Sequence, residues 1–456
     1  MTAAESVDAI VLGLGVGGER VGGRLAEAGL SVVGIEAQLV GGECPYWGCI
    51  PSKMIIRAAN LLAEARRIPG VAGASTVTPD WSPVAARVRA EATDNWDDRV
   101  AVERFEGQGG RFVRGAGRFE APNVVSVDEQ RFEATRAVVI ATGSAAVIPP
   151  IPGIADVDPW TNREAIATET LPASLVVLGG GAIGLELAQP FARFGVAVTV
   201  VEGEHHLLAR EEPEVGDLIQ DVLTAEGMTL RTGVSVAGVH RDGGRTVVAL
   251  SDGSEVSGER LLVATGRRAD LAAFGAGKAG LDESARFVEV DEHLRAGDRL
   301  WAVGDVTGKG MFTHIAVYQG DLAAANILGE DHEPADYHAL PRVTFTDPEV
   351  GSVGMSEADA RDAGIEVRTG IAHVPETARG WMHKTGNEGV IKVVEDADRG
   401  VLVGATSMGP WGGEVLGLLT LAVQAKIPTH DLRTMIYAYP TFHRGIEDAL
   451  RDLAGS

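Results

Sequence analysis

The sequence predicts an α/β fold with two Rossmann-like dinucleotide-binding domains, followed by a C-terminal α+β domain. Two segments, residues 7–36 and 174–202, each combine an apolar strand, a glycine-rich turn, a helix, a second strand and an acidic residue. Their wide separation excludes a short-period repeat array and indicates an internal duplication of one βαβ unit. From about residue 338 the sequence changes to alternating short strands and a final helix-rich segment, which predicts a separate last domain.

Length and charge restrict the possible functions. A chain of 456 residues exceeds the size of about 250–300 residues at which a single hydrophobic core stops growing, so we expect several domains. The net charge of −24 disfavours binding to nucleic acid and to anionic membranes, because both are polyanions. No apolar run is long enough to span a membrane, and the N-terminus lacks the basic and apolar regions of an export signal. We therefore expect a cytoplasmic protein that binds neither nucleic acid nor a membrane.

The first glycine-rich turn has the features of a pyrophosphate-binding site. Gly13, Gly15 and Gly18 satisfy the pattern G-x-G-x-x-G after a strand and before a helix. The first glycine permits the tight turn, the second the close approach of a pyrophosphate, and the third the packing of helix on strand. The helix N-terminus offers N–H groups to the phosphates. Glu36 ends the second strand, where a carboxylate can accept a hydrogen bond from a ribose hydroxyl.

The second turn repeats this pattern with Gly179, Gly181, Gly184 and Glu202. Two such units predict two bound dinucleotides. An acid at the position of Glu202 favours NADH, because it accepts from the free 2′-hydroxyl and would repel a 2′-phosphate. Basic side chains follow the acid in the sequence, so NADPH stays an alternative.

Cys44 and Cys49 are the only cysteines in the chain. A zinc site is disfavoured, because it needs about four ligands and neither a second cysteine pair nor a nearby histidine is present. A structural disulfide would close a very small loop and is unusual in the cytosol. A redox-active pair agrees best with the sequence, since Pro51 suits the first turn of a helix. We expect Cys49 near that helix N-terminus, which lowers a thiol pKa and favours the thiolate.

The segment "GGECPYWGCIPSK" at residues 41–53 resembles the redox-active disulfide signature of the class I pyridine nucleotide-disulfide oxidoreductases. This family of flavoprotein disulfide reductases includes dihydrolipoamide dehydrogenase, glutathione reductase and mercuric reductase. The resemblance covers nearly the whole chain. It includes both nucleotide units and the motifs "ATGS" at 141–144, "ATGRR" at 264–268, "AVGD" at 302–305 and "FTDPEVGSVG" at 345–354.

The resemblance implies an FAD-dependent enzyme that passes hydride from NAD(P)H through the flavin to a Cys44–Cys49 disulfide, and then to an acceptor. It implies that Cys49 faces the flavin and that Cys44 is the exchange thiol. Lys53 is expected to pair with Glu186 close to the flavin, and Asp305 to bind its ribityl chain. The motifs add further expected cofactor-binding residues, namely Gly42, Thr142, Gly143, Gly266 and Gly304.

The same resemblance implies how the chain divides into domains. Residues 1–148 and 270–337 are expected to form an FAD-binding domain in two parts, with an NAD(P)-binding domain at 149–269 between them. Residues 338–456 are expected to form a dimerisation domain, which implies a homodimer.

The C-terminus departs from the pattern of the family. Disulfide reductases of this family carry a His-Pro-Thr motif and a Glu five residues after the His. Here Tyr439 occupies the His position and Arg444 the Glu position. An unperturbed phenol, with a pKa of about 10, is a poor base at neutral pH. Either His443, with Glu447 one helical turn further on, supplies a displaced acid-base pair, or the acceptor needs no such base.

Three interpretations of the function stay open from the sequence. The first hypothesis is a disulfide or dithiol. The second is a quinone, a metal ion or oxygen reduced by the flavin directly, or a transhydrogenase-like activity. The hypothesis of a metal acceptor is weakened, because the C-terminal segment "LRDLAGS" lacks the extra vicinal cysteines that hand over a metal ion. The bulky "PYW" between the two thiols forms either packing contacts or a flat pocket for an aromatic acceptor. A non-enzymatic redox sensor is the third reading.

Overall fold

The computed structural model describes residues 3–455 and divides into two compact units. The first unit comprises Met1–Pro51, Ala86–Val147 and Gly266–Asp336. The second comprises Ser52–Ala85, Ile148–Thr265 and Tyr337–Ser456. Helices α3 and α4 cross the boundaries between these segments.

The first unit is built on one mixed sheet of eight strands. The central order β16-β17-β6-β1-β2-β3 contains the parallel pairs β17/β6, β6/β1, β1/β2 and β2/β3, while β5 and β4 extend from β6. Its strands are β1 (Glu5–Leu12), β2 (Val32–Glu36), β3 (Arg111–Arg114), β4 (Arg118–Ala121), β5 (Val124–Val127), β6 (Gln130–Ile140), β16 (Arg295–Gly297) and β17 (Leu300–Ala302), with β7 (Ala145–Ala146) and β15 (Arg267–Arg268) as a separate pair. Its helical segments are α1 (Val16–Glu27), α2 (Glu43–Tyr46), η1 (Val88–Ala92), η2 (Asp94–Trp96), α5 (Arg99–Gly107), η4 (Ala272–Phe274), η5 (Ala276–Ala279), η6 (Gly304–Thr307) and α9 (Thr313–Leu328).

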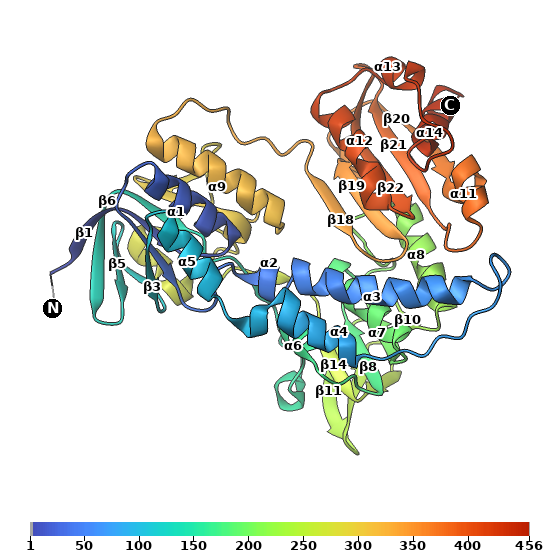
Figure 1. Cartoon of the computed structure of the whole chain (residues 1–456), viewed down its shortest axis with the longest axis horizontal. Coiled ribbons are helices and arrows are strands. Elements are labelled where there is room, and N and C mark those ends of the chain that lie inside the picture. The colour runs from blue at the N-terminus through green and yellow to red at the C-terminus, as the bar shows by residue number, and fades with distance from the viewer. Residues whose placement is uncertain (1–2, 456) are drawn as a thin grey trace. The chain divides into compact units, whose positions relative to one another are not determined.

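Strand β1 shows why this sheet is covered on both faces. Successive side chains of a strand point to opposite faces. Ala9 and Val11 pack in a core cluster with α1, α5 and α9, which lie together in Figure 1. Ile10 and Leu12 pack in a second cluster with β4, β5 and the 3₁₀ turns. Because both faces are buried, the strand is a continuous apolar run, as expected for a parallel sheet.

The second unit contains a smaller parallel sheet of order β10-β9-β8-β14 and an antiparallel sheet of order β11-β12-β13. The strands are β8 (Ser174–Leu178), β9 (Ala197–Val201), β10 (Thr229–Arg231), β11 (Val236–Asp242), β12 (Arg245–Leu250), β13 (Glu255–Gly258) and β14 (Arg260–Val263). The helical segments are α3 (Cys49–Arg67), α4 (Ser82–Arg87), η3 (Ile154–Val157), α6 (Asn162–Ala167), α7 (Ala182–Arg193) and α8 (Pro213–Ala225).

The second unit also holds a five-stranded antiparallel sheet of order β18-β19-β22-β21-β20. Its strands are β18 (Pro341–Thr344), β19 (Glu349–Gly354), β20 (Val367–His373), β21 (Val390–Asp396) and β22 (Val401–Gly409). Its helical segments are α10 (Glu357–Asp362), η7 (Val374–Glu376), α11 (Ala378–His383), α12 (Gly412–Gln424), α13 (Thr429–Thr434) and α14 (Gly445–Gly455). Apolar side chains of α12 and α14 share one core cluster with this sheet. Figure 1 shows both helices beside the sheet.

These elements confirm the predicted fold class, with two βαβ units and a C-terminal α+β part. No helix within residues 3–455 is long and apolar enough to cross a membrane.

Candidate functional site

The first glycine turn needs its glycines for steric reasons. Gly13 has φ +97°, and a Cβ there would lie 2.4 Å from the carbonyl oxygen of Ala141. A Cβ on Gly18 would lie 2.0 Å from the carbonyl oxygen of Gly13. Gly15 caps α1 with extended backbone, and no side chain caps this helix in the described structure. The N–H groups of the first helical turn are therefore available to a phosphate.

The second turn reproduces this geometry. Gly179 has φ +109°, and its Cβ would lie 2.4 Å from the carbonyl oxygen of Ala264. A Cβ on Gly184 would lie 2.1 Å from the carbonyl oxygen of Gly179. A Cβ on Gly181 would meet no heavy atom within 4 Å, so space is open above the turn. Helix α7 also lacks a side-chain cap among the described residues.

The two acids hold their turns in the same way. Glu36 accepts hydrogen bonds from the backbone N–H groups of Leu14, at 2.8 Å, and of Gln38, at 2.7 Å. Glu202 accepts from the N–H groups of Gly180, at 2.6 Å, and of Glu204, at 2.9 Å. Each carboxylate thus lies directly beside the glycine turn of its own unit, where a ribose would be recognised.

The two cysteines lie on consecutive helices. Cys44 belongs to the short helix α2, and Cys49 is the first residue of α3. Both are half-buried. The Cys49 Sγ lies 3.3 Å from the Oγ1 of Thr313, a contact that sequence reasoning missed. Cys49 therefore lies at the N-terminal end of a helix, as the sequence predicted. Helix N-termini in general stabilise negative charge.

The glycine before the first cysteine joins the redox loop to the first turn. Gly42 has φ +69°, and a Cβ there would lie 2.9 Å from the Cα of Gly15. Only glycine therefore permits this close approach of the two backbones. Between the cysteines, the indole ring of Trp47 stacks on that of Trp96, with centroids 5.4 Å apart and planes at 23°. This stacking favours the packing interpretation of "PYW".

Asp305 is the centre of a polar cluster in the first unit. It lies in the 3₁₀ turn η6 and accepts a hydrogen bond of 2.6 Å from the hydroxyl of Ser144. Arg267 donates to the same hydroxyl at 2.9 Å and to the Ser144 carbonyl at 2.7 Å. Burial raises the pKa of Asp305, and the hydrogen bond from Ser144 partly opposes this effect. Ser144 and Arg267 belong to quoted motifs, but sequence reasoning did not single them out.

The remaining glycines of these motifs have left-handed or otherwise positive φ values. Gly143 and Gly266 have φ +69° and +131°, and a Cβ on either would meet no heavy atom within 4 Å. Gly304 has φ +80° and donates its N–H to the buried side chain of Gln319 at 2.7 Å. Thr142 is exposed beside them.

Lys53 and Glu186 form an ion pair with an Nζ–Oε2 distance of 2.7 Å. Lys53 lies one turn after Cys49 on α3, and Glu186 lies in the first half of α7. The ammonium of Lys53 also lies 4.5 Å from the ring centroid of Phe345. The backbone N–H of Phe345 donates to the other carboxylate oxygen of Glu186 at 2.9 Å. Sequence reasoning missed Phe345, because nothing in its local pattern indicates this contact.

The structure corrects the expected spacing at the C-terminus. Helix α14 begins only at Gly445, so His443 lies before this helix and is not one turn of the same helix away from Glu447. Tyr439 is 66% exposed, and the guanidinium of Arg444 lies 5.3 Å from its ring centroid. Glu447 pairs with Arg444 at 3.2 Å and also with Arg451. Both arginines thus form ion pairs with the carboxylate that an acid-base pair of His443 and Glu447 would need.

The described residues agree with binding of two dinucleotides. In each βαβ unit, the glycine turn leaves no room for larger side chains at its first and third glycines. The helix that follows has no side-chain cap at its N-terminus, and a carboxylate lies at the end of the next strand. Within residues 3–455, no group of three His, Cys, Asp or Glu side chains could hold a metal ion.

Comparison with protein families gives two matches. Residues 7–320 match the pyridine nucleotide-disulphide oxidoreductase family, and residues 340–450 match the dimerisation domain of the same family. The chain is 32% identical over 466 residues to a dihydrolipoyl dehydrogenase of Thermus scotoductus, covering 98% of each protein. It is 31% identical over 445 residues to a mercuric reductase of Bacillus cereus, covering 96% of this chain and 70% of that relative.

Solved structures with the same fold agree. The HOCl-induced flavoprotein disulfide reductase RclA of Escherichia coli, solved as a Cu(II) complex, superposes with a TM-score of 0.87 at 26% identity, covering 98% of this chain and 99% of that one. LpdA of Mycobacterium tuberculosis superposes with a TM-score of 0.85 at 25% identity, again covering 98% and 99%. The chain therefore belongs to the pyridine nucleotide-disulphide oxidoreductases, and it is an oxidoreductase that uses FAD and NAD(P)H and carries the dimerisation domain of that family.

Proposed function

We propose that this enzyme transfers electrons from NADH through FAD to a disulfide formed by Cys44 and Cys49, and from there to a disulfide acceptor. The observation that carries the proposal is the placement of Cys49 at the first residue of α3, with Cys44 on the helix just before it. FAD, when bound, accepts a hydride from the nicotinamide and delivers the two electrons to the disulfide.

The roles of the surrounding residues follow from their contacts. Lys53, held by Glu186 and Phe345, presents a fixed positive charge one turn after Cys49. Asp305, held by Ser144 and Arg267, offers a carboxylate for the ribityl chain of FAD. The glycine turn that begins at Gly13 is assigned to FAD, and the turn that begins at Gly179 to NADH. Glu202 supports NADH over NADPH, because its carboxylate lies beside the second turn.

The thiol steps balance as an exchange reaction. Two electrons break the Cys44–Cys49 bond and, with one proton, leave Cys49 as a thiolate and Cys44 as a thiol. Once Cys44 has lost its proton, its sulfur attacks an acceptor disulfide, forms a mixed disulfide and expels one acceptor thiolate. Cys49 then attacks the Cys44 sulfur, restores the protein disulfide and releases the second acceptor thiolate, which takes a proton from solvent.

The domain boundaries are part of the proposal. We assign residues 1–148 and 270–337 to FAD, 149–269 to NAD(P)H and 338–456 to assembly of a homodimer. The grouping of Ala86–Val147 with Gly266–Asp336 in one compact unit supports the two-part FAD domain. The match of residues 340–450 to a dimerisation domain supports the homodimer.

A metal ion is a second candidate acceptor. The exposed Tyr439 replaces the family's histidine base. The side chain at this position is therefore a poor donor of a proton to a leaving thiolate. Two of the similar proteins, a mercuric reductase and RclA in its Cu(II) complex, are described with metals. Electrons passed from the reduced thiols to a metal ion require no such base.

An anaerobic titration with NADH tests the proposal. We expect the purified protein to take up about two hydride equivalents per flavin, with a long-wavelength absorption band from a thiolate beside the flavin after the first. Cys44→Ser should keep the fold and FAD but abolish turnover with disulfides, because the exchange thiol is lost. Uptake of one equivalent by the unsubstituted protein, or full disulfide turnover by Cys44→Ser, would refute the disulfide route.

A further inference from the structure

Helix α7 carries one polar face that is buried. Glu186, Gln189 and Arg193 lie at i, i+3 and i+7, so they share one side of the helix. Their exposed fractions are 8%, 2% and 4%. Buried polar side chains cost free energy unless they are hydrogen-bonded, so their partners define what this face does.

All three side chains bind the loop between β18 and β19. Glu186 accepts from the N–H of Phe345 at 2.9 Å. Gln189 accepts from the N–H of Asp347 and donates to its carbonyl oxygen, both at 2.8 Å. Arg193 donates to the carboxylate of Asp347 at 2.8 Å. The loop 345–347 is thus fixed to α7 at two of its residues, Phe345 and Asp347, by three side chains of the helix.

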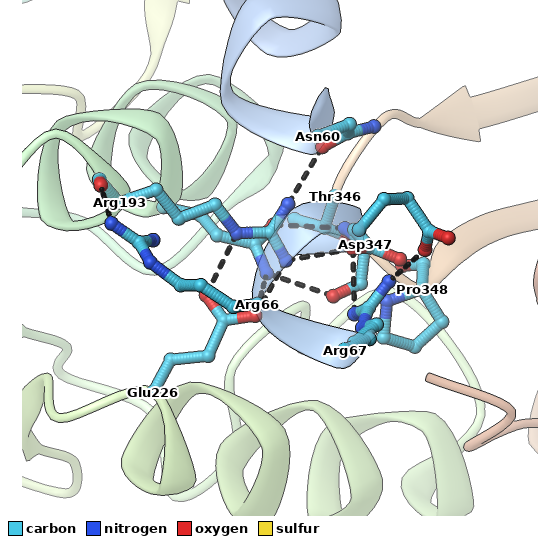
Figure 2. Close-up of polar contacts among 10 residues, drawn as sticks. Asn60, Arg66, Arg67, Arg193, Glu226, Thr346, Asp347 and Pro348 are labelled. Carbon is cyan, nitrogen blue, oxygen red and sulfur yellow. Dashed lines mark hydrogen bonds and ion pairs between the residues drawn. The ribbon is translucent and has the colours of Figure 1, made fainter. Parts of the chain in front are cut away.

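The same face also fixes helix α3, as Figure 2 shows for its far end. Arg193 donates to the side-chain oxygen of Asn60 at 2.6 Å, and Arg66 donates to the carbonyl of Arg193 at 2.7 Å. Arg67 pairs with Asp347 at 2.8 Å. Together with the pair between Lys53 and Glu186, these contacts connect three turns of α3 to α7 and to the loop.

The charges in this buried cluster balance. Arg193 pairs with Glu226 at 3.0 Å and with Asp347, while Arg67 also pairs with Asp347 (Figure 2). With the pair between Arg67 and Glu64 at 2.7 Å and the guanidinium of Arg66 on the carbonyl of Arg193, three guanidinium groups lie among three carboxylates. Because each charge is paired with fixed geometry, the cluster has little freedom to reorganise without leaving a buried charge uncompensated.

We propose that Gln189 and Arg193 are positioning residues for the reaction: they fix loop 345–347 and α3 against α7, and thereby hold Lys53 on Glu186 in the geometry that flavin reduction requires. This inference rests on the proposed role of Lys53 and Glu186. Gln189 acts only through neighbours, because two of its hydrogen bonds go to the backbone of Asp347 and a third goes to the carboxylate of Glu226 at 3.2 Å. Arg193 acts through Asn60 and Asp347 in the same way.

Two substitutions that keep side-chain length and charge nearly unchanged test the positioning role. Gln189→Met removes both hydrogen bonds to Asp347 without adding a charge, and Arg193→Lys keeps the charge but loses the planar fork. In the FAD-loaded proteins, three quantities are measured: hydrogen exchange of the segment around 345–347, the rate at which an amine reagent labels Lys53, and the rate of flavin reduction by NADH.

Lys392→Met is the matched control. Lys392 is buried and binds Glu212 and Glu357 at 2.9 Å and Glu214 at 2.8 Å, so it also connects the segments 149–269 and 338–456. It touches neither Lys53 nor Glu186. Ser352→Ala, which removes a hydrogen bond to Glu211, is a milder control in the same region, should Lys392→Met fold poorly.

We expect Gln189→Met to increase exchange at 345–347 and labelling of Lys53 several-fold relative to both controls, and to slow flavin reduction about 10- to 100-fold. Arg193→Lys should give a smaller change of the same kind. Labelling and reduction equal to the unsubstituted protein, or an equal loss in the controls, would overturn the positioning role. Labelling and exchange need no acceptor, so these results stand apart from the NADH titration that decides the proposed function.

Discussion

Tyr439 stands where the disulfide reductases that this chain resembles carry a histidine. Its ring is exposed and is covered on one side by Arg444, where the family carries an acid. A protonated imidazole at position 439 would therefore be disfavoured by the neighbouring guanidinium. A histidine here needs a carboxylate partner to act as a general acid and base.

We expect the double substitution Tyr439→His with Arg444→Glu to raise turnover of lipoamide-like dithiols, by up to about 100-fold, because it restores an oriented base. Tyr439→His alone should give a smaller gain. Steady-state assays with dihydrolipoamide measure the effect, and Tyr439→Phe, which adds no base, is the control. If the double variant shows no gain, the acceptor pocket rather than the missing base limits the reaction.

The two βαβ units have the same construction, but a substitution in one glycine turn should weaken nucleotide binding in that unit alone. Gly181 has φ −82° and ψ −178°, which any residue can adopt, and its Cβ position is open. The backbone fold of the turn does not by itself require glycine at this position. The glycine is explained by the space that a pyrophosphate needs.

Gly181→Val should therefore fold and bind FAD normally while weakening NADH binding. Intrusion of the side chain into the phosphate space should cost about 1–3 kcal/mol, or roughly 5- to 150-fold in affinity. Fluorescence titration with NADH measures it. Gly417→Ala, on α12 with open surroundings, should leave the affinity unchanged. Unaltered NADH binding by Gly181→Val would show that the nucleotide does not lie over this turn.

At the scale of the whole molecule, the C-terminal part exposes several large apolar side chains. Ile436 is 96% exposed, Tyr439 66% and Trp411 53%. Water-exposed apolar groups of this size are typical of surfaces that are covered by a partner. Since residues 340–450 match a dimerisation domain, we expect a second copy of the chain to cover them.

Ile436→Glu should shift the protein from a dimer toward a monomer of 47.6 kDa, because a buried unpaired carboxylate is costly in an apolar interface. Light scattering at several protein concentrations measures the mass. Val71→Glu, at an exposed valine outside the matched dimerisation domain, is the control. A dimer that persists unchanged in Ile436→Glu would place the interface elsewhere.

Features that depend on near neighbours along the chain could be predicted from the amino-acid sequence. The third glycine of each turn was predictable from its neighbours, because the atoms that exclude a Cβ at Gly18 and Gly184 belong to Gly13 and Gly179, five residues earlier. The helix start at Cys49 was predictable for the same reason, since Pro51 and the apolar run after it act locally. The pairing of Lys53 with Glu186 could be expected only through resemblance to a family.

Tertiary structure decided every contact between distant residues. Cys49 meets Thr313 across 264 positions, and Gln189 meets Asp347 across 158. Periodicity and capping specify a local backbone, but they do not say which side chains the strand order brings together. The same limit explains the error at His443, where α14 begins later than the spacing suggested and Glu447 is taken by arginines. Local sequence thus predicted the glycine pattern of the nucleotide turns and the start of the helix that carries Cys49. The buried polar face of α7, in contrast, depends on contacts between residues that are distant in the sequence.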